Sequence, residues 1–330
     1  MTMARRALVL GGSGHVGNAV VRELLARGWA VTAARRGRSD ARNLAGLAVA
    51  DALGDADHPA TALRWIAGHD AVVDAAAPYP LGLADRAAAA VAARRAAILV
   101  DAAARHRAHL IHIGSLVTRL GTDGAGHPRE PGQRLDSQIH PYFAAKRAGE
   151  AVLAAAAHAV PISLVHPSLC MGPWDCRPAA LCLVPSVLAG QVPAMPSQIV
   201  NIIDVRDVAR AVAAIAEAEP REPLRLTGHN IGLPELCALI GELAGIRVTI
   251  RAFPAAAARV AAWAGWALDL ARPGAVTPPV LLLTMLALRQ ASLPVGAAQR
   301  ALGAVPRPLS VTLRDAIAWH RGLAQSAAPL

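Results

Sequence analysis

The segment LVLGGSGHVG, residues 8–17, constrains the fold more than any other part of the chain. It places Gly11, Gly14 and Gly17 three residues apart, between a short apolar run and an amphipathic stretch. This order predicts a strand, a tight turn and a helix. Glycines at these positions let the backbone approach a pyrophosphate at the N-terminus of the helix. The segment predicts a dinucleotide-binding loop, and the plain alternative is a glycine-rich turn that binds nothing.

Short apolar runs alternate with alanine-rich stretches through the first half of the chain. The apolar runs predict strands at residues 7–10, 30–34, 47–51, 70–77, 109–115 and 162–167. The stretches between them predict helices at residues 15–28, 57–67, 83–105 and 141–157. This alternation indicates an α/β fold, a Rossmann-type doubly wound parallel sheet.

Beyond residue 167 the pattern loosens and prolines interrupt it. We expect a nucleotide-binding domain over residues 1–167, to which residues 201–218 return after a turn or short strand. Residues 168–330 are expected to form a smaller, mainly helical substrate-binding lobe. A length of 330 residues suits two such parts.

The net charge of +10 favours anionic ligands. The arginines are scattered and lack interleaved aromatic residues, so nucleic acid is not an expected partner. No signal peptide and no apolar run of about 20 residues is apparent, which predicts a cytoplasmic protein without a membrane span. Neither the four cysteines nor His106, His109 and His112 have the spacing of a metal site, and no metal is expected.

The end of the second predicted strand bears on the choice of cofactor. Arg35, Arg36 and Arg38 follow this strand, and no acidic residue precedes Asp40. An acidic residue at this place binds the ribose 2′-hydroxyl of NAD, whereas arginine accommodates the 2′-phosphate of NADP. NADP(H) is the predicted cofactor, and NAD(H) remains the alternative.

The segment PYFAAK contains the chain's only lysine, Lys146, four residues after Tyr142. Two residues at this spacing lie on one face of a helix. A phenol is a poor base at neutral pH, and a nearby ammonium lowers its pKa towards a useful range. An arginine that stays protonated cannot copy the lysine's variable pKa. The pair is a candidate acid–base site.

These motifs together resemble the extended short-chain dehydrogenase/reductase family. Its nearest branch looks like the dihydroflavonol-reductase-like and 3β-hydroxysteroid-dehydrogenase-like enzymes. The matches are the glycine loop, ADALGD (50–55), AAAPY (75–79), HIGSL (112–116), YFAAK (142–146), HPSLCMGPWD (166–175), NIIDVRDVARA (201–211) and the C-terminal residues 302–321. They cover nearly the whole chain in the family's order.

The resemblance implies roles for individual residues. Ser115, Tyr142 and Lys146 would be catalytic, with Ser115 donating a hydrogen bond to the substrate oxygen. Besides the three loop glycines, Tyr142 and Lys146, the implied cofactor-binding residues are Ser13, His15, Val16, Arg35, Arg36, Asp51, Ala75, Ala76, Ala77, His166, Pro167 and Ser168. The candidate substrate-binding residues are Tyr79, Leu116, Met171 and Trp174. The chain departs from the family pattern at Leu10, Gly114 and His166.

The resemblance implies an enzyme that interconverts a ketone and a secondary alcohol with hydride transfer. Apolar residues at 170–190 and 254–290 suggest a small hydrophobic substrate, although such stripes also pack a core. The same apolar lobe would suit peripheral contact with a membrane surface. Two alternatives stay open, a nucleotide-sugar epimerase or dehydratase with tightly bound NAD, and a dinucleotide-sensing protein without turnover. Family analogy also suggests a homodimer that pairs through helices 83–105 and 141–157.

Overall fold

The structure is a computed structural model that describes residues 4–76, 87–119, 141–177, 182–192, 194–220, 222–272 and 292–326. In these residues, seven parallel strands form the central sheet in the order β10-β6-β5-β4-β1-β2-β3. The strands are β1 (Arg6–Leu10), β2 (Ala30–Arg35), β3 (Ala50–Leu53), β4 (Ala71–Asp74), β5 (His109–Ile113), β6 (Ile162–Pro167) and β10 (Leu224–Leu226). The predicted doubly wound fold is confirmed.

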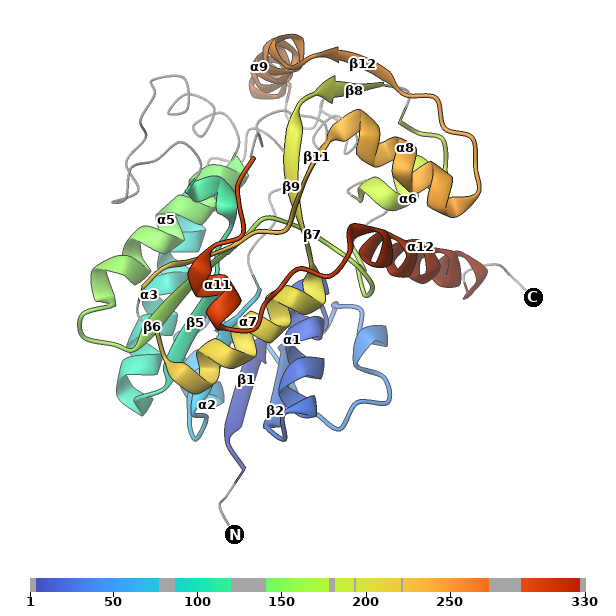
Figure 1. Cartoon of the computed structure of the whole chain (residues 1–330). Coiled ribbons are helices and arrows are strands. Elements are labelled where there is room, and N and C mark those ends of the chain that lie inside the picture. The colour runs from blue at the N-terminus through green and yellow to red at the C-terminus, as the bar shows by residue number, and fades with distance from the viewer. Residues whose placement is uncertain are drawn as a thin grey trace.

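Helices cover both faces of this sheet (Figure 1). α1 (His15–Ala26) and α7 (Val205–Ala218) lie side by side on one face, whereas α2 (Pro59–Ile66), α3 (Ala88–His106) and α5 (Pro141–Ala156) cover the other. The apolar run of β1 divides between the two cores: Ala7 and Val9 join one, Leu8 and Leu10 the other. A strand that is buried on both faces needs such a continuous apolar run.

The chain reverses its direction of winding at β1. From β1 it goes outwards to β2 and β3, then crosses to β4 on the other side of β1. The carboxyl ends of β1 and β4, at Leu10 and Asp74, therefore border a switch point of the sheet. In open α/β sheets ligands bind in the crevice outside such a point.

The first six predicted strands are present in the predicted order, with one shift. β3 spans Ala50–Leu53, about three residues later than the expected 47–51. The segment before it contains a short 3₁₀ helix, Arg42–Leu44, and a turn at Gly46 with φ +74°. Positive φ at a glycine interrupts a strand, so the apolar residues just after Gly46 remain outside the sheet.

The chain returns to the sheet after an excursion into the smaller lobe. α7 begins at its N-cap Asp204, whose carboxylate accepts a hydrogen bond from the backbone N–H of Arg206 at 2.8 Å. This bond satisfies one of the orphan N–H groups of the helix. α7 packs on α1, and β10 then pairs with β6 as the seventh strand.

The smaller lobe combines helices with short strands, of which the sequence indicated only β9 (Ile199–Asp204), expected as a turn or short strand. Its strands are β7 (Leu169–Met171), β8 (Ala194–Ser197), β9, β11 (His229–Gly232) and β12 (Arg251–Pro254), which form sheets β11-β9-β7 and β12-β8. Its helices are α6 (Leu183–Leu188), α8 (Leu233–Ala244), α9 (Ala255–Ala271), α11 (Ala297–Ala301) and α12 (Leu309–Ser326). A separate apolar core lies beneath α6, α8 and α12.

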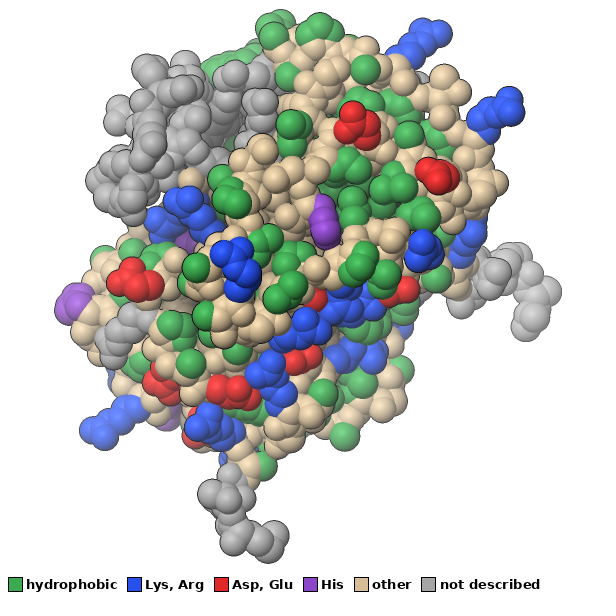
Figure 2. All heavy atoms as spheres, in the orientation of Figure 1, with side chains coloured by type: hydrophobic (Ala, Val, Ile, Leu, Met, Phe, Trp, Pro, Cys, Tyr) green, Lys and Arg blue, Asp and Glu red, His purple; other side chains and the backbone are tan. Residues whose placement is uncertain are grey.

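Charges of both signs are interspersed on the face shown in Figure 2. Ion pairs join Arg27 of α1 to Glu217 of α7 at 3.0 Å, and Arg206 of α7 to Asp315 of α12 at 2.6 Å. Surface pairs of this kind contribute little stability, on the order of 1 kcal/mol or less. Over the described ranges, no helix is both long and apolar enough to cross a bilayer.

Candidate active site

The glycine loop lies between the end of β1 and the start of α1. Gly11 has φ +74°, a conformation that favours glycine, and Gly14 is the N-cap of α1. A Cβ atom at Gly17 would overlap the carbonyl oxygen of Gly11. The loop therefore packs too closely for side chains, and the helix N-terminus is open to an anionic ligand.

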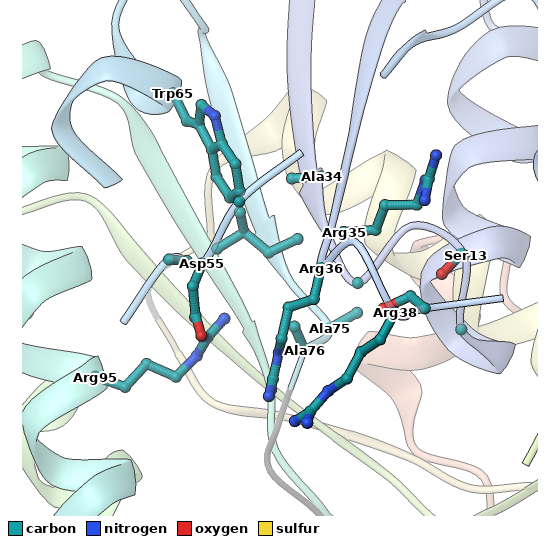
Figure 3. A pocket seen from close by; sticks show the side chains of 16 residues that line it. Ser13, Ala34, Arg35, Arg36, Arg38, Asp55, Trp65, Ala75, Ala76 and Arg95 are labelled. Carbon is teal, nitrogen blue, oxygen red and sulfur yellow. The ribbon is translucent and has the colours of Figure 1, made fainter. Parts of the chain in front are cut away.

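A pocket of about 420 Å³ opens beside this loop (Figure 3). Its floor is made by the ends of β1, β2 and β4, and α2 supplies Trp65. The pocket is lined by Leu10, Gly11, Ser13, Gly14, Ala34, Arg35, Arg36, Arg38, Ser39, Gly54, Asp55, Ala56, Trp65, Ala75, Ala76 and Arg95. A volume of this size is typical of a small-molecule or cofactor site.

Asp51, an expected cofactor-binding residue, does not line this pocket. Its carboxylate instead binds the guanidinium of Arg35, with Nε to Oδ1 at 3.0 Å and Nη2 to Oδ2 at 2.5 Å. The acidic residue on the pocket wall is Asp55. Asp51 lies away from the pocket because β3 ends at Leu53, so that residues 54–56 follow the carboxyl end of the strand.

Arg36 and Arg38 are placed differently from Arg35. Figure 3 shows their guanidinium groups pointing to the same side, whereas Arg35 turns away from them. Neither the Arg36 nor the Arg38 guanidinium group has a hydrogen bond or ion pair to another described residue. Two unpaired guanidinium groups beside a glycine loop provide fork-shaped donors for a phosphate.

The candidate catalytic residues come from the ends of two neighbouring elements. Ser115 follows β5, and Tyr142 and Lys146 lie one turn apart in α5; all three are buried. The Lys146 ammonium donates a hydrogen bond to the carbonyl oxygen of Ile113, the last residue of β5, at 2.9 Å. This bond ties α5 to the strand end that carries Ser115.

A buried carboxylate, Glu150, lies one turn after Lys146 and explains the departure at Gly114. A Cβ atom at Gly114 would overlap Glu150 Oε1. The Thr118 hydroxyl lies 2.9 Å from Glu150 Oε2 and 2.8 Å from the carbonyl oxygen of Ser115, and these acceptors share its one proton. The cluster therefore fixes the segment from residue 114 to residue 118.

His166, an expected cofactor-binding residue, belongs to the same cluster. It is fully buried in β6, and its Nε2 atom lies 3.0 Å from Glu150 Oε2. Its ring packs among core groups and does not line the pocket beside the glycine loop. Pro167 ends β6, and the Ser168 amide donates a hydrogen bond to Leu226 of β10 at 2.9 Å.

The expected substrate-binding residues are engaged mainly in packing. Leu116 is buried in a short 3₁₀ helix, and Met171 joins the core of the smaller lobe. Trp174 has φ +68° and lies under the guanidinium of Arg22 in α1, 4.7 Å from the ring centroid. Tyr79 and the expected cofactor contact Ala77 lie outside the described residues.

The sequence profile of the NAD-dependent epimerase/dehydratase family matches residues 7–226, from β1 to β10. The chain belongs to this family. It is therefore an NAD(P)-dependent enzyme of the extended short-chain dehydrogenase/reductase type, as the motifs predicted.

Two relatives and one solved structure illustrate the similarity. A Synechocystis sp. protein that is provisionally named dihydroflavonol 4-reductase is 29% identical to this chain over 259 residues, which cover 74% of each chain. Sterol demethylase protein B of Methylococcus capsulatus is 27% identical over 252 residues, 72% of this chain and 74% of its own. The crystal structure of gox2253 has a TM-score of 0.79 and 26% identity, and the alignment covers 98% of this chain and 99% of the other.

His15 is the first residue of α1, and its side chain is buried. Burial lowers its pKa to about 4, and Asp175, whose carboxylate lies 3.9 Å from the ring, opposes this shift. The unfolded chain binds a proton at about pH 6.5 that the folded chain excludes. The free energy of unfolding should therefore fall by about 3 kcal/mol as the pH drops from about 6.5 to about 4, then level off.

Urea unfolding over this pH range tests the prediction. His15→Phe should remove most of the acid-dependent loss, because phenylalanine has no proton to bind in the unfolded chain. His158→Gln is the matched control, since His158 is exposed in the turn that follows α5. Parallel pH curves for wild type and His15→Phe would show that another group causes the loss.

Proposed function

We propose that the protein is an NADP(H)-dependent oxidoreductase that interconverts a ketone and a secondary alcohol on a small hydrophobic substrate. The observation that carries the cofactor assignment is the pair Arg36 and Arg38 at the pocket wall. A ribose 2′-phosphate carries about two negative charges, which two unpaired guanidinium groups would compensate. NAD would instead require an acidic partner for its 2′-hydroxyl at the end of β2, where the chain has Arg35 and Arg36.

The cofactor fits the residues of the pocket. The open N-terminus of α1 and the close-packed glycine loop suit a pyrophosphate, and the wall contributed by Ala75 and Ala76 leaves room beside it. The chemistry that the nicotinamide supplies when bound is hydride transfer to or from the carbon that bears the oxygen.

Three side chains would handle the proton and the charge. Tyr142 is the proposed general acid in reduction: its phenol gives a proton to the substrate oxygen, and in oxidation its phenolate takes one. Lys146 stabilises the phenolate through its charge. Ser115 donates a hydrogen bond to the oxygen on which negative charge develops.

The substrate class rests on the smaller lobe and on the relatives. The names of the two relatives refer to a dihydroflavonol and a sterol, both of which carry large hydrocarbon skeletons. In this chain α9 presents Val260 and Leu268 to solvent, with exposed fractions of 69% and 50%. Exposed apolar side chains of this kind suit contact with such a substrate better than contact with a sugar nucleotide.

A second candidate function is epimerisation or dehydration of a nucleotide sugar with tightly bound NAD. The description of the matched family, which names epimerases and dehydratases, favours it. The two functions differ in how the cofactor is held, because an epimerase keeps its NAD through the catalytic cycle. A cytoplasmic location and a homodimer that pairs through α3 and α5 remain predictions.

Titration with NADPH and NADH, followed by nicotinamide fluorescence, tests the cofactor assignment. Arg36→Ala and Arg38→Ala should each weaken NADPH binding by about 10- to 100-fold, because each removes a charged hydrogen bond. NADH binding should change little. Arg35→Ala should be less selective, since Arg35 is held by Asp51.

Arg225→Ala is the matched control for a lost positive charge. Arg225 is exposed on β10, at the opposite edge of the sheet from β3. Equal effects of Arg38→Ala on NADPH and NADH would contradict the 2′-phosphate site. Protein purified with bound NAD, or a preference for NADH, would make the epimerase or dehydratase function the better one.

A further inference from the structure

A small cavity of about 20 Å³ lies beside Lys146. Four ionisable side chains from four different elements border it: Asp74 of β4, Arg95 of α3, His112 of β5 and Lys146 of α5. The rest of the wall consists of the small residues Ala92, Ala96, Ala145 and Gly149. The exposed fraction of each ionisable residue is below 10%, so these charges lie in the core.

Asp74 connects two of these side chains. Its Oδ1 accepts a hydrogen bond from Arg95 Nη2 at 3.0 Å, and its Oδ2 lies 2.9 Å from His112 Nδ1. Burial by itself would raise the pKa of Asp74, but the charge of Arg95 and the hydrogen bond from His112 hold it well below its usual range. An ionised carboxylate only accepts hydrogen bonds, so His112 Nδ1 carries a hydrogen.

The other ring nitrogen of His112 is then the atom that gains or loses a proton. His112 Nε2 is buried and has no hydrogen-bond partner among the described residues, and the same holds for Arg95 Nε. Both nitrogens belong to residues that line the cavity. A volume of about 20 Å³ accommodates one water molecule, which needs two to four polar partners.

Lys146 can supply a further partner. Its ammonium has three hydrogens, and the bond to the Ile113 carbonyl uses one of them. One water in the cavity could accept from Lys146 and Arg95 and donate to His112 Nε2. This arrangement would satisfy both orphan nitrogens and link the ammonium to the imidazole.

We propose that His112, oriented by Asp74, is a positioning residue that exchanges protons with Lys146 through one water in this cavity. The proposal rests on the acid–base roles proposed for Tyr142 and Lys146. After Tyr142 has given its proton to the substrate oxygen, the ammonium passes one proton to the phenolate. This step starts from the imidazolium, in which Nε2 has bound a second proton and donates to the water instead of accepting from it. The water gives a proton to the lysine amine and takes one from Nε2, which leaves the imidazole neutral and the water unchanged.

The charges around His112 oppose one another. Asp74 favours the imidazolium, and so does Glu150, whose pKa His112 helps to lower. Arg95 and Lys146 border the same cavity and favour the neutral ring.

The single lysine of the chain permits a direct test without a substrate. Protein grown with isotope-labelled lysine gives one ammonium nitrogen signal in nuclear magnetic resonance, that of Lys146. In the wild-type protein this signal should shift in one step over the pH range in which an imidazole titrates. His112→Gln should abolish that step, because glutamine fills similar space without a titrating nitrogen.

His106→Gln is the matched control, since His106 is exposed at the end of α3, and it should leave the step in place. Asp74→Asn is a second variant for the case in which His112→Gln does not fold. It should move the step to lower pH, because the carboxylate that favours the imidazolium is lost. A wild-type signal without a step, or a step that persists in His112→Gln, would overturn the proposal.

This measurement separates the proton exchange from the proposed reaction. If the protein reduces no ketone but its Lys146 signal shows the pH-dependent step, the proton exchange with His112 is supported and the ketone reductase function is refuted. A protein that reduces ketones but lacks the step would refute the coupling alone.

Discussion

Replacement of Tyr142 by phenylalanine is expected to lower the rate of ketone reduction by about 10²- to 10⁴-fold, the usual contribution of a positioned acid or base. The phenol hydroxyl is the only group removed. The ring itself packs edge-to-face against Phe143, with centroids 5.7 Å apart, and phenylalanine preserves this contact. The fold and the cofactor pocket should therefore remain as they are.

A panel of hydrophobic ketones with NADPH supplies the assay, and fluorescence titration of NADPH supplies the control for binding. Lys146→Arg should also lose most of the activity, although it preserves a positive charge, because a guanidinium does not give up its proton. A Tyr142→Phe protein that retains more than about a tenth of the wild-type rate would show that another group protonates the substrate.

Replacement of Arg95 by methionine is expected to lower the free energy of unfolding by about 3–5 kcal/mol, the cost of breaking a buried ion pair. Arg95 Nη1 lies 2.6 Å from Asp57 Oδ1, and Nη2 lies 3.0 Å from Asp74 Oδ1. Methionine would fill part of the space and leave the buried Asp74 carboxylate without its main counter-charge. Urea unfolding measures the loss.

The matched control lies in the same helix. Arg105→Met removes an exposed pair with Asp101, in which both side chains are more than 60% exposed, and should cost less than about 1 kcal/mol. Asp74→Asn added to Arg95→Met should recover part of the loss, because it removes the unpaired charge. Similar losses in Arg95→Met and Arg105→Met would mean that the buried pair contributes no more than a surface pair.

The nucleotide-binding half could be predicted well because its signals are local. The run at residues 7–10 is apolar on both sides, as a central parallel strand must be, and the glycine spacing after it is a property of adjacent residues. Tyr142 and Lys146 share a helix turn, so their common face also follows from spacing.

The features that the sequence did not predict depend on contacts between residues that are distant along the chain. Nothing near Arg35 indicates that Asp51 on the neighbouring strand would bind it and leave Arg36 and Arg38 for the pocket. Glu150 and His166 likewise meet only in the folded chain, across a helix and a strand. Three strands of the smaller lobe, β8, β11 and β12, contain glycine or proline and are too brief for a periodic pattern.

The path of the chain after β6 constrains how natural recombination or protein engineering could exchange the smaller lobe. Residues 205–226 contribute α7 and the edge strand β10 to the nucleotide-binding sheet, although they follow strands of the smaller lobe. A chimera with one junction after residue 167 would combine a sheet from one parent with a foreign α7 and β10. An exchange that preserves the sheet needs three junctions, near residues 168, 204 and 227. The smaller lobe, the proposed substrate-binding part, should therefore diversify more readily by substitution within it than by its replacement as a block.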